Sequence, residues 1–163
     1  MARKSRVITE NEKKETVKVF VWKIGIYIRL SKEDLRNNDE SESVTNQRKI
    51  NLEFVEEKFA DEKYIIYDIY IDDGRSGTTE DTRPDFQRLS KDIREGNVNC
   101  VVCKTLARAF RNYADQGKFL EQYLPTYGCR FIAFGNPYVD TFANPDCMQN
   151  MEIPINGLMN DRY

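Results

Sequence analysis

The sequence predicts an α/β domain in which a mostly parallel sheet of four or more strands is covered by helices on both faces. Segments rich in Val, Ile, Phe and Tyr alternate along the chain with segments whose apolar residues recur at helical spacing. The third strand-like segment, VNCVVCK, is apolar enough to be central in a parallel sheet. Strands that alternate with helices in this way form parallel sheets through crossover connections.

The first half of the predicted domain begins after residues 1–18, which we expect to form a mobile arm. A strand near 23–29 ends in the sequence IYIRLSKED, and a polar loop over 32–42 follows it. A helix is expected from about Ser43, a residue type that caps helix N-termini well. One face of this helix carries the apolar residues Leu52, Val55 and Phe59.

The second half repeats the alternation. A strand over 64–72 leads into a glycine-bearing surface loop over 72–82, after which Pro84 suits the first turn of a helix. Gly96 is expected to end that helix, and Gly128 the next one. The remaining elements are a strand over 98–104, a helix over 112–127 whose apolar face carries Leu120, Tyr123, Leu124 and Tyr127, and a strand over 129–135.

The C-terminal tail has a different pattern. A loop with the sequence NPYVDTFANPD precedes an apolar stripe at helical spacing. Because this stripe has no evident partner within the domain, we expect a helix at a subunit interface and a chain that continues into a longer protein. The predicted catalytic domain is therefore 19–147, and 148–163 begin the interface helix. The stripe consists of Met148, Met151, Ile155, Leu158 and Met159.

Length and composition indicate one folded domain. The chain has 163 residues, of which 40% are hydrophobic and 32% charged, which is typical of a globular protein. No apolar run approaches the roughly 18 residues of a membrane span, and the basic N-terminus lacks the apolar core of a signal peptide. We therefore expect a cytoplasmic protein without a membrane partner.

The residue inventory excludes several mechanisms. The chain has no histidine, so it cannot contain a Ser-His-Asp triad or a Cys-His pair. Its four cysteines lack a second pair at zinc spacing, and the Cys100–Cys103 pair lies in an apolar strand, so we expect core cysteines and no metal. The net charge of −2 does not suggest a strong nucleic-acid binder.

Candidate functional residues gather where the predicted strands end, which is where α/β sheets bind ligands. Ser31 follows the first strand between Arg29 and Lys32. The third strand is followed by KTLARAFR, in which Arg108 and Arg111 share one side of a helical turn. Taken alone, such residues are ordinary caps and solvated charges, but their common position favours function.

A hydroxyl among guanidinium groups suits phosphoryl transfer. Guanidinium groups bind phosphate oxygens bidentately and do not lose their protons. Phosphoryl transfer requires neutralisation of the charge on the equatorial oxygens more than it requires covalent assistance. A serine could therefore attack a phosphodiester here without a metal or a nucleotide cofactor, although the residues do not identify the general base.

Four motifs in order resemble those of the serine recombinases, the resolvase/invertase family. They are YIRLSKED, SVTNQ, YIDDGRSGTTEDTRPDFQRL and VVCKTLARAFRN, and the longer matches, together with NDRY near the end, are most similar to the large serine recombinases, integrases and transposon recombinases. The resemblance covers roughly residues 23–163. It implies a site-specific DNA recombinase domain that acts as a dimer and forms a tetramer during crossover.

The resemblance also implies roles for individual residues. Ser31 would cut DNA and form a 5′-phosphoserine linkage, and Gln47 would support the site. Asp161 would match an acidic residue on the long interface helix that leads to a DNA-binding domain. The residues implied to hold the scissile phosphate are Arg29, Arg83, Arg108 and Arg111. Those expected to contact DNA elsewhere are Lys104, Arg75 and Arg162, and the expected interface residues are Met151, Ile155, Leu158 and Met159.

Three departures from the family pattern keep alternatives open. Thr105 replaces a common aspartate, Ala107 an aspartate or serine, and Phe110 a glycine or other small residue. A catalytically impaired regulatory homologue therefore remains one alternative. The other is a metal-dependent phosphoryl-transfer enzyme that uses Asp72 and Asp73, and a chelator would inactivate only this one.

Overall fold

The computed structural model describes residues 19–30, 40–72, 83–110 and 113–149. Within them a five-stranded sheet has the order β2-β1-β3-β4-β5, in which β1 to β4 are parallel and β5 is antiparallel to β4. The predicted α/β class and mostly parallel sheet are thus confirmed. The strands are β1 (Trp22–Arg29), β2 (Tyr64–Asp72), β3 (Cys100–Cys103), β4 (Arg130–Ala133) and β5 (Val139–Asp140).

The helices lie between the strands in the predicted order. The helix that was expected from Ser43 begins three residues earlier, at Glu40. The helix expected over 112–127 is described from Tyr113 and contains a π-helical stretch in its middle. The elements are α2 (Glu40–Lys58), α3 (Pro84–Arg94), α4 (Leu106–Ala109), α5 (Tyr113–Gly117), the π-helix η1 (Lys118–Tyr123), α6 (Leu124–Thr126) and the 3-10 helix η2 (Pro145–Gln149).

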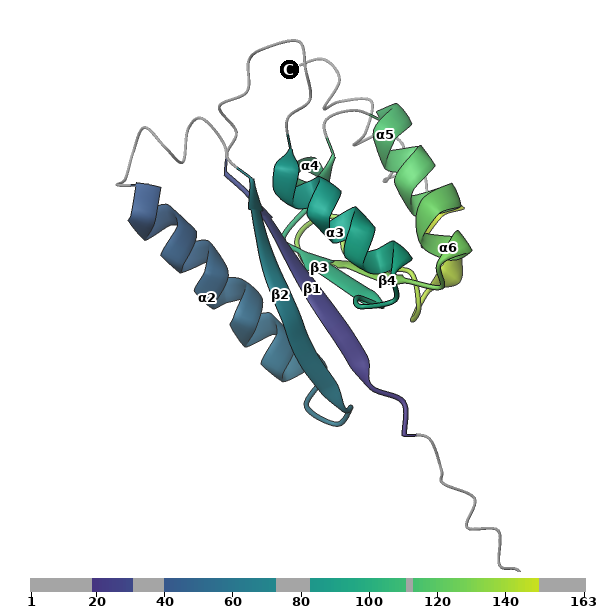
Figure 1. Ribbon diagram of the computed structural model, residues 1–163, viewed down its shortest axis with the longest axis horizontal. Coiled ribbons are helices and arrows are strands. Elements are labelled where there is room, and N and C mark those ends of the chain that lie inside the picture. The colour runs from purple at the N-terminus through teal and green to yellow at the C-terminus, as the bar shows by residue number, and fades with distance from the viewer. Residues whose placement is uncertain (1–18, 31–39, 73–82, 111–112, 150–163) are drawn as a thin grey trace, which may run out of the picture.

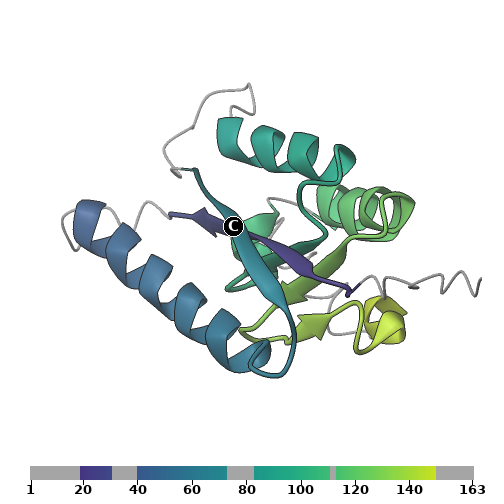
Figure 2. The same ribbon diagram turned by 60° about the horizontal axis from the view of Figure 1, so that its bottom comes forward.

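Helices cover both faces of the sheet, as Figures 1 and 2 show. Helix α2 packs on the face to which β1 contributes Ile24, Ile26 and Ile28. Helices α3 and α5–α6 pack on the other face, to which β1 contributes Tyr27. Because successive side chains of a strand point to opposite faces, Arg29 belongs to the face that α3 covers.

Two glycines end helices where the sequence predicted it. Gly96 follows α3 with φ of 74°, and Gly128 follows α6 with φ of 60°, a conformation that costs glycine little and other residues more. Leu120 and Leu124 of the last helix are buried as expected, whereas Tyr127 is 40% exposed at its end. The four cysteines are free and buried, which confirms their assignment to the core.

A buried ion pair holds the β4–β5 end of the sheet. The Arg130 guanidinium donates from Nε to Asp140 Oδ1 at 3.0 Å and from Nη2 to Oδ2 at 2.8 Å. The same guanidinium lies over the rings of Trp22, Phe59 and Phe142 at 4.9–5.2 Å. This contact joins β4 to the two-residue β5, which lies inside the segment that was predicted to be a loop.

The tail prediction falls mainly beyond the described residues. Met148 lies in η2, a 3-10 helix rather than the start of an α-helix. The rest of the predicted interface helix lies outside the described residues, as does the predicted arm at 1–18. In the described part of the chain, no helix combines the length and apolar character that a membrane span requires.

Candidate functional site

The carboxyl ends of β1 and β3 bring two of the predicted basic residues, Arg29 and Lys104, to one edge of the sheet. Arg29 is the last residue of β1 and lies opposite Asp72, the last residue of β2. Lys104 follows β3 directly and is partly buried. The N-terminal ends of α2, α3 and α4 lie at this same edge (Figure 1). The edge therefore combines cations with backbone N–H groups of helix N-termini.

Asp72 anchors α3 to the sheet at this edge. Its Oδ1 accepts a hydrogen bond from the backbone N–H of Asp85 at 3.0 Å, and its Oδ2 accepts one from that of Phe86 at 3.0 Å. Oδ2 also accepts the Tyr27 hydroxyl at 2.9 Å. Asp72 is only 2% exposed and Tyr27 1%. Both carboxylate oxygens therefore satisfy N–H groups that a helix N-terminus leaves unpaired.

Arg83 joins α3 to α4. It immediately precedes α3, is 5% exposed, and places its guanidinium 4.2 Å from the centre of the Phe86 ring. Its Nη1 donates to the carbonyl oxygen of Ala109 at 2.7 Å. Ala109 is the last residue of α4, the short helix whose backbone includes Arg108. The side chain of Arg83 therefore links the start of α3 to α4, the helix whose backbone includes the predicted site residue Arg108.

Burial and the neighbouring charges shift the pKa of Tyr27. Burial raises the pKa of Tyr27 well above its usual value, and Asp72 raises it further. The positive charges of Arg83 and Arg29 oppose this rise in the Tyr27 pKa. By geometry, Arg29 ends β1 opposite Asp72, and Asp72 binds the first turn of α3, which directly follows Arg83.

Other predicted site residues are only partly placed. Gln47 lies on α2, is 8% exposed, and accepts the Asn51 side-chain amide with its backbone carbonyl oxygen at 2.8 Å. It comes from the helix on the opposite face from α3. The backbone of Arg108 lies in α4, but its side chain lies outside the described residues. Also outside them are Ser31, Arg75, Arg111, Arg162 and the interface residues Met151, Ile155, Leu158 and Met159.

Sequence reasoning missed that Tyr27 and Asp72 form the buried contact that anchors α3 to the sheet. Asp72 was considered only as a possible metal ligand, and Tyr27 only as a strand residue. A signal was present, because Tyr27 precedes Arg29 by two residues and so shares its face of β1. The Asp72 contact was harder to foresee, because its partners lie thirteen and fourteen residues further along the chain.

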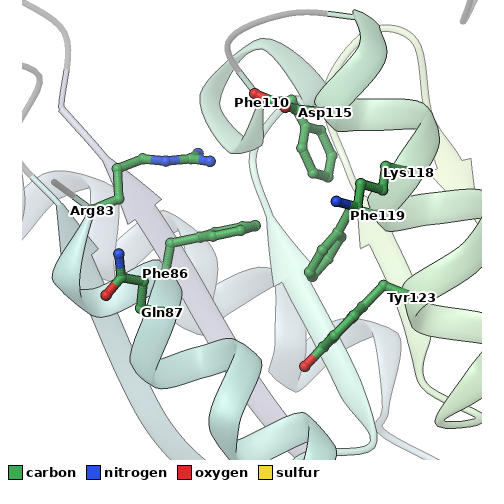
Figure 3. Close-up of a pocket in the computed structure, with 8 residues that line it drawn as sticks. All are labelled: Arg83, Phe86, Gln87, Phe110, Asp115, Lys118, Phe119 and Tyr123. Carbon is green, nitrogen blue, oxygen red and sulfur yellow. The ribbon is translucent and has the colours of Figure 1, made fainter. Parts of the chain in front are cut away.

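A pocket of about 240 Å³ opens beside Arg83 (Figure 3). Phe86 extends into it from α3, opposite Phe119 and Tyr123, whose rings stack at 5.2 Å. Phe110, one of the departures from the family pattern, packs 5.5 Å from Phe119 by ring centres. The large side chain at 110 thus fills space between α4 and the following helix. The pocket is lined by Arg83, Phe86, Gln87, Phe110, Asp115, Lys118, Phe119 and Tyr123.

The sequence matches one family model over most of its length. The model, described as the resolvase N-terminal domain, matches residues 24–152. This chain belongs to the resolvase family. The resemblance that the ordered motifs indicated is thereby confirmed. Among curated proteins, none matches the sequence significantly.

Solved structures of resolvase-family proteins have a similar fold. A resolvase family site-specific recombinase from Streptococcus pneumoniae is 27% identical, with a TM-score of 0.61 over 83% of this chain and 85% of that one. The N-terminal catalytic domain of TP901-1 integrase is 23% identical, with a TM-score of 0.61 over 82% of this chain and 92% of that one. The C-terminal catalytic domain of ISC1926 TnpA, an IS607-like serine recombinase, is 18% identical, with a TM-score of 0.53 over 70% of each chain.

Proposed function

We propose that this resolvase-family domain is the catalytic domain of a site-specific DNA recombinase. The observation that carries the proposal is that Arg29 ends β1 opposite Asp72, whose carboxylate holds the first turn of α3 directly after Arg83. Ser31 follows Arg29 by two residues in the sequence. Similarity to the Streptococcus pneumoniae recombinase adds support from a protein with the same fold.

In the proposed reaction, Ser31 attacks the phosphorus atom of a DNA phosphodiester. A bond forms between the serine oxygen and phosphorus as the bond from phosphorus to the 3′ oxygen breaks. The serine gives up its proton and the leaving 3′ oxygen gains one, so that the products are a 5′-phosphoserine and a 3′ hydroxyl. Rejoining reverses these steps on a new 3′ hydroxyl, and the phosphoserine bond conserves the energy that this requires.

The arginines supply the charge that this reaction needs. The transition state spreads negative charge over the equatorial phosphate oxygens, and guanidinium groups bind those oxygens in pairs. Arg83 is held by Phe86 and by Ala109, so it needs little reorganisation when the phosphate arrives. Arg29, Arg108 and Arg111 complete the set, and this number of cations makes a metal unnecessary in the proposed mechanism.

The remaining predicted residues have supporting parts in the proposal. Gln47 supports the site from α2. Lys104, Arg75 and Arg162 contact the DNA backbone, where each cation adds salt-dependent affinity. The apolar stripe of Met151, Ile155, Leu158 and Met159 forms the dimer interface, and two dimers associate when the sites are paired.

The experiment that tests the proposal is strand cleavage by the full-length protein with and without a chelator. The substrate is a duplex of its recombination site, located by sequencing the DNA that the protein binds. We expect cleavage in the presence of the chelator and none with Ser31→Ala. Cleavage that the chelator abolishes would contradict the proposal and favour the metal-dependent alternative. Specific binding without any cleavage would favour the regulatory homologue.

A further inference from the structure

Gly135 lies against the turn that leads from β3 into α4. Its backbone N–H donates to the carbonyl oxygen of Lys104 at 2.6 Å, and the preceding N–H of Phe134 donates to that of Cys103 at 3.2 Å. These two bonds continue the β3–β4 ladder beyond the ends of both strands. The chain segment after β4 is therefore bonded to the segment that starts α4.

The approach of the two segments leaves no room for a side chain at position 135. A Cβ atom on Gly135 would lie 2.6 Å from Thr105 Cγ2 and 2.7 Å from the Lys104 carbonyl oxygen. Both distances are shorter than Cβ atoms tolerate, and one of them is to backbone, which cannot rotate away. Any residue other than glycine must therefore displace the backbone at Lys104 and Thr105.

Such a displacement reaches Arg108 through a four-residue helix. The carbonyl oxygen of Thr105 accepts the N–H of Ala109 at 3.2 Å, and that of Leu106 accepts the N–H of Phe110 at 2.8 Å. At the C-terminal end of α4, the Ala109 carbonyl oxygen accepts Arg83 Nη1 at 2.7 Å. The helix is thus held at its start by the contact with Gly135 and at its end by Arg83.

We propose that Gly135 is a positioning residue for the recombinase reaction, because its lack of a side chain sets the place of α4 and so of Arg108. This inference rests on the proposed function, in which Arg108 binds the scissile phosphate. Gly135 touches neither DNA nor the reacting atoms in this account. Its effect is transmitted through Lys104, Thr105 and the backbone of α4.

The test compares three glycine variants of the full-length protein. Gly135→Ala is the variant of interest. Gly25→Ala is the control for lost stability, since its Cβ would lie 3.0–3.1 Å from the core side chains of Leu89, Tyr70 and Val98. Gly117→Ala is the control for a harmless change, since the nearest atom to its Cβ would be 4.0 Å away, on Glu121. Each variant is assayed for folded fraction, DNA affinity and cleavage rate on saturated DNA.

We expect Gly135→Ala to lose about 100-fold in cleavage rate, the loss typical of a reacting group displaced by about 1 Å, and to lose far less than this in DNA affinity, to which the cations outside this turn also contribute. Gly25→Ala should lose activity only in proportion to its folded fraction, and Gly117→Ala should cleave as the wild type. The double variant Gly135→Ala with Thr105→Ser should recover part of the rate, because it removes the contact with Thr105 Cγ2 and leaves the one with the Lys104 oxygen.

Hydrogen exchange gives a readout that does not depend on activity. Peptides covering 104–110 should exchange faster in Gly135→Ala than in the wild type, and unchanged exchange there would overturn the proposal. The proposal would also be overturned if Gly135→Ala cleaved at the wild-type rate, or if its loss of cleavage rate only matched its loss of folded fraction. If the wild type itself formed no covalent adduct on Ser31, the proposed function would fail. If the wild type and Gly135→Ala formed the adduct at the same rate, only the Gly135 proposal would be overturned.

Discussion

Tyr27 of β1 and Asp72, the last residue of β2, share one buried hydrogen bond, in which the phenol donates to Oδ2 at 2.9 Å. The same carboxylate accepts two backbone N–H groups from the first turn of α3. Because Arg83 immediately precedes that turn, the Tyr27–Asp72 contact helps to fix where the guanidinium of Arg83 lies. Stability and the proposed phosphate binding would therefore depend on the same buried residues.

Removal of the Tyr27 hydroxyl should destabilise the domain. Tyr27→Phe leaves Asp72 with one hydrogen bond fewer, and a lost bond to a buried charged group costs about 1–3 kcal/mol of unfolding free energy. The measurement is urea unfolding of the variant and the wild type. Tyr67→Phe is the matched control, because Tyr67 is 44% exposed and its substitution should change the unfolding free energy little. Equal losses of unfolding free energy in Tyr27→Phe and Tyr67→Phe would contradict a stabilising role for the Tyr27–Asp72 hydrogen bond.

Shortening the reach of Arg83 should slow cleavage more than it weakens binding. In Arg83→Lys the charge remains, but an ammonium group cannot bind phosphate oxygens bidentately as a guanidinium does. Loss of one preorganised donor to a transition state costs about 100- to 1,000-fold in rate. The measurement is the single-turnover cleavage rate of Arg83→Lys and of the wild type on saturated DNA. The control is Arg88→Lys, because the ion pairs that Arg88 forms with Asp85 and Asp68 are exposed. This variant should cleave normally.

Breaking the Arg130–Asp140 pair should cost more stability than breaking an exposed pair. Asp140→Asn removes the buried carboxylate that pairs with the Arg130 guanidinium and leaves the more distant Glu62, at 4.0 Å, as its charge partner. Loss of one member of a buried pair costs about 3–5 kcal/mol. Glu95→Gln, which breaks the exposed pair with Lys91, should cost at most about 1 kcal/mol. Chemical unfolding of both variants checks the difference. Similar losses would show that the pair is not the anchor of β5.

The same pair predicts sensitivity to acid. Burial alone would raise the pKa of Asp140, but the bonds from Arg130 and from the N–H groups of Ala143 and Phe142 outweigh it and hold that pKa below its usual range. A carboxyl whose folded pKa is depressed contributes stability above its unfolded pKa, about 3.9, and that contribution is lost as the pH falls below it. Unfolding free energy should therefore drop less steeply below about pH 4 in Asp140→Asn than in the wild type.

Local sequence patterns were sufficient for the main elements. The strand at 64–72 has the predicted bounds, because a run of β-branched and aromatic residues, interrupted only by Asp68, ends at aspartates and glycine. Gly96 and Gly128 end helices as predicted, because the left-handed conformation at those positions favours glycine over other residues. These features depend on neighbours along the chain, which a sequence displays directly.

Features that depend on tertiary contacts could not be foreseen. The strand β5 has two residues, and it exists through the pairing of Asp140 with Arg130 rather than through local propensity. Asp72 was considered as a metal ligand because its contacts with α3 are not visible in the sequence. Family motifs name the basic residues of the candidate site, and their roles stay predictions, whereas the buried contacts that hold Arg83 are not visible in the sequence.

The most direct test of the account identifies the atom that becomes bound to DNA. Full-length protein is incubated in chelator with a nicked suicide duplex of its recombination site, digested, and examined by mass spectrometry, with Ser31→Ala as the control. The account predicts a peptide that carries a 5′-linked nucleotide on Ser31 and its complete absence in the alanine variant. An adduct on any other residue, or cleavage without an adduct, would contradict the central claim that Ser31 is the nucleophile.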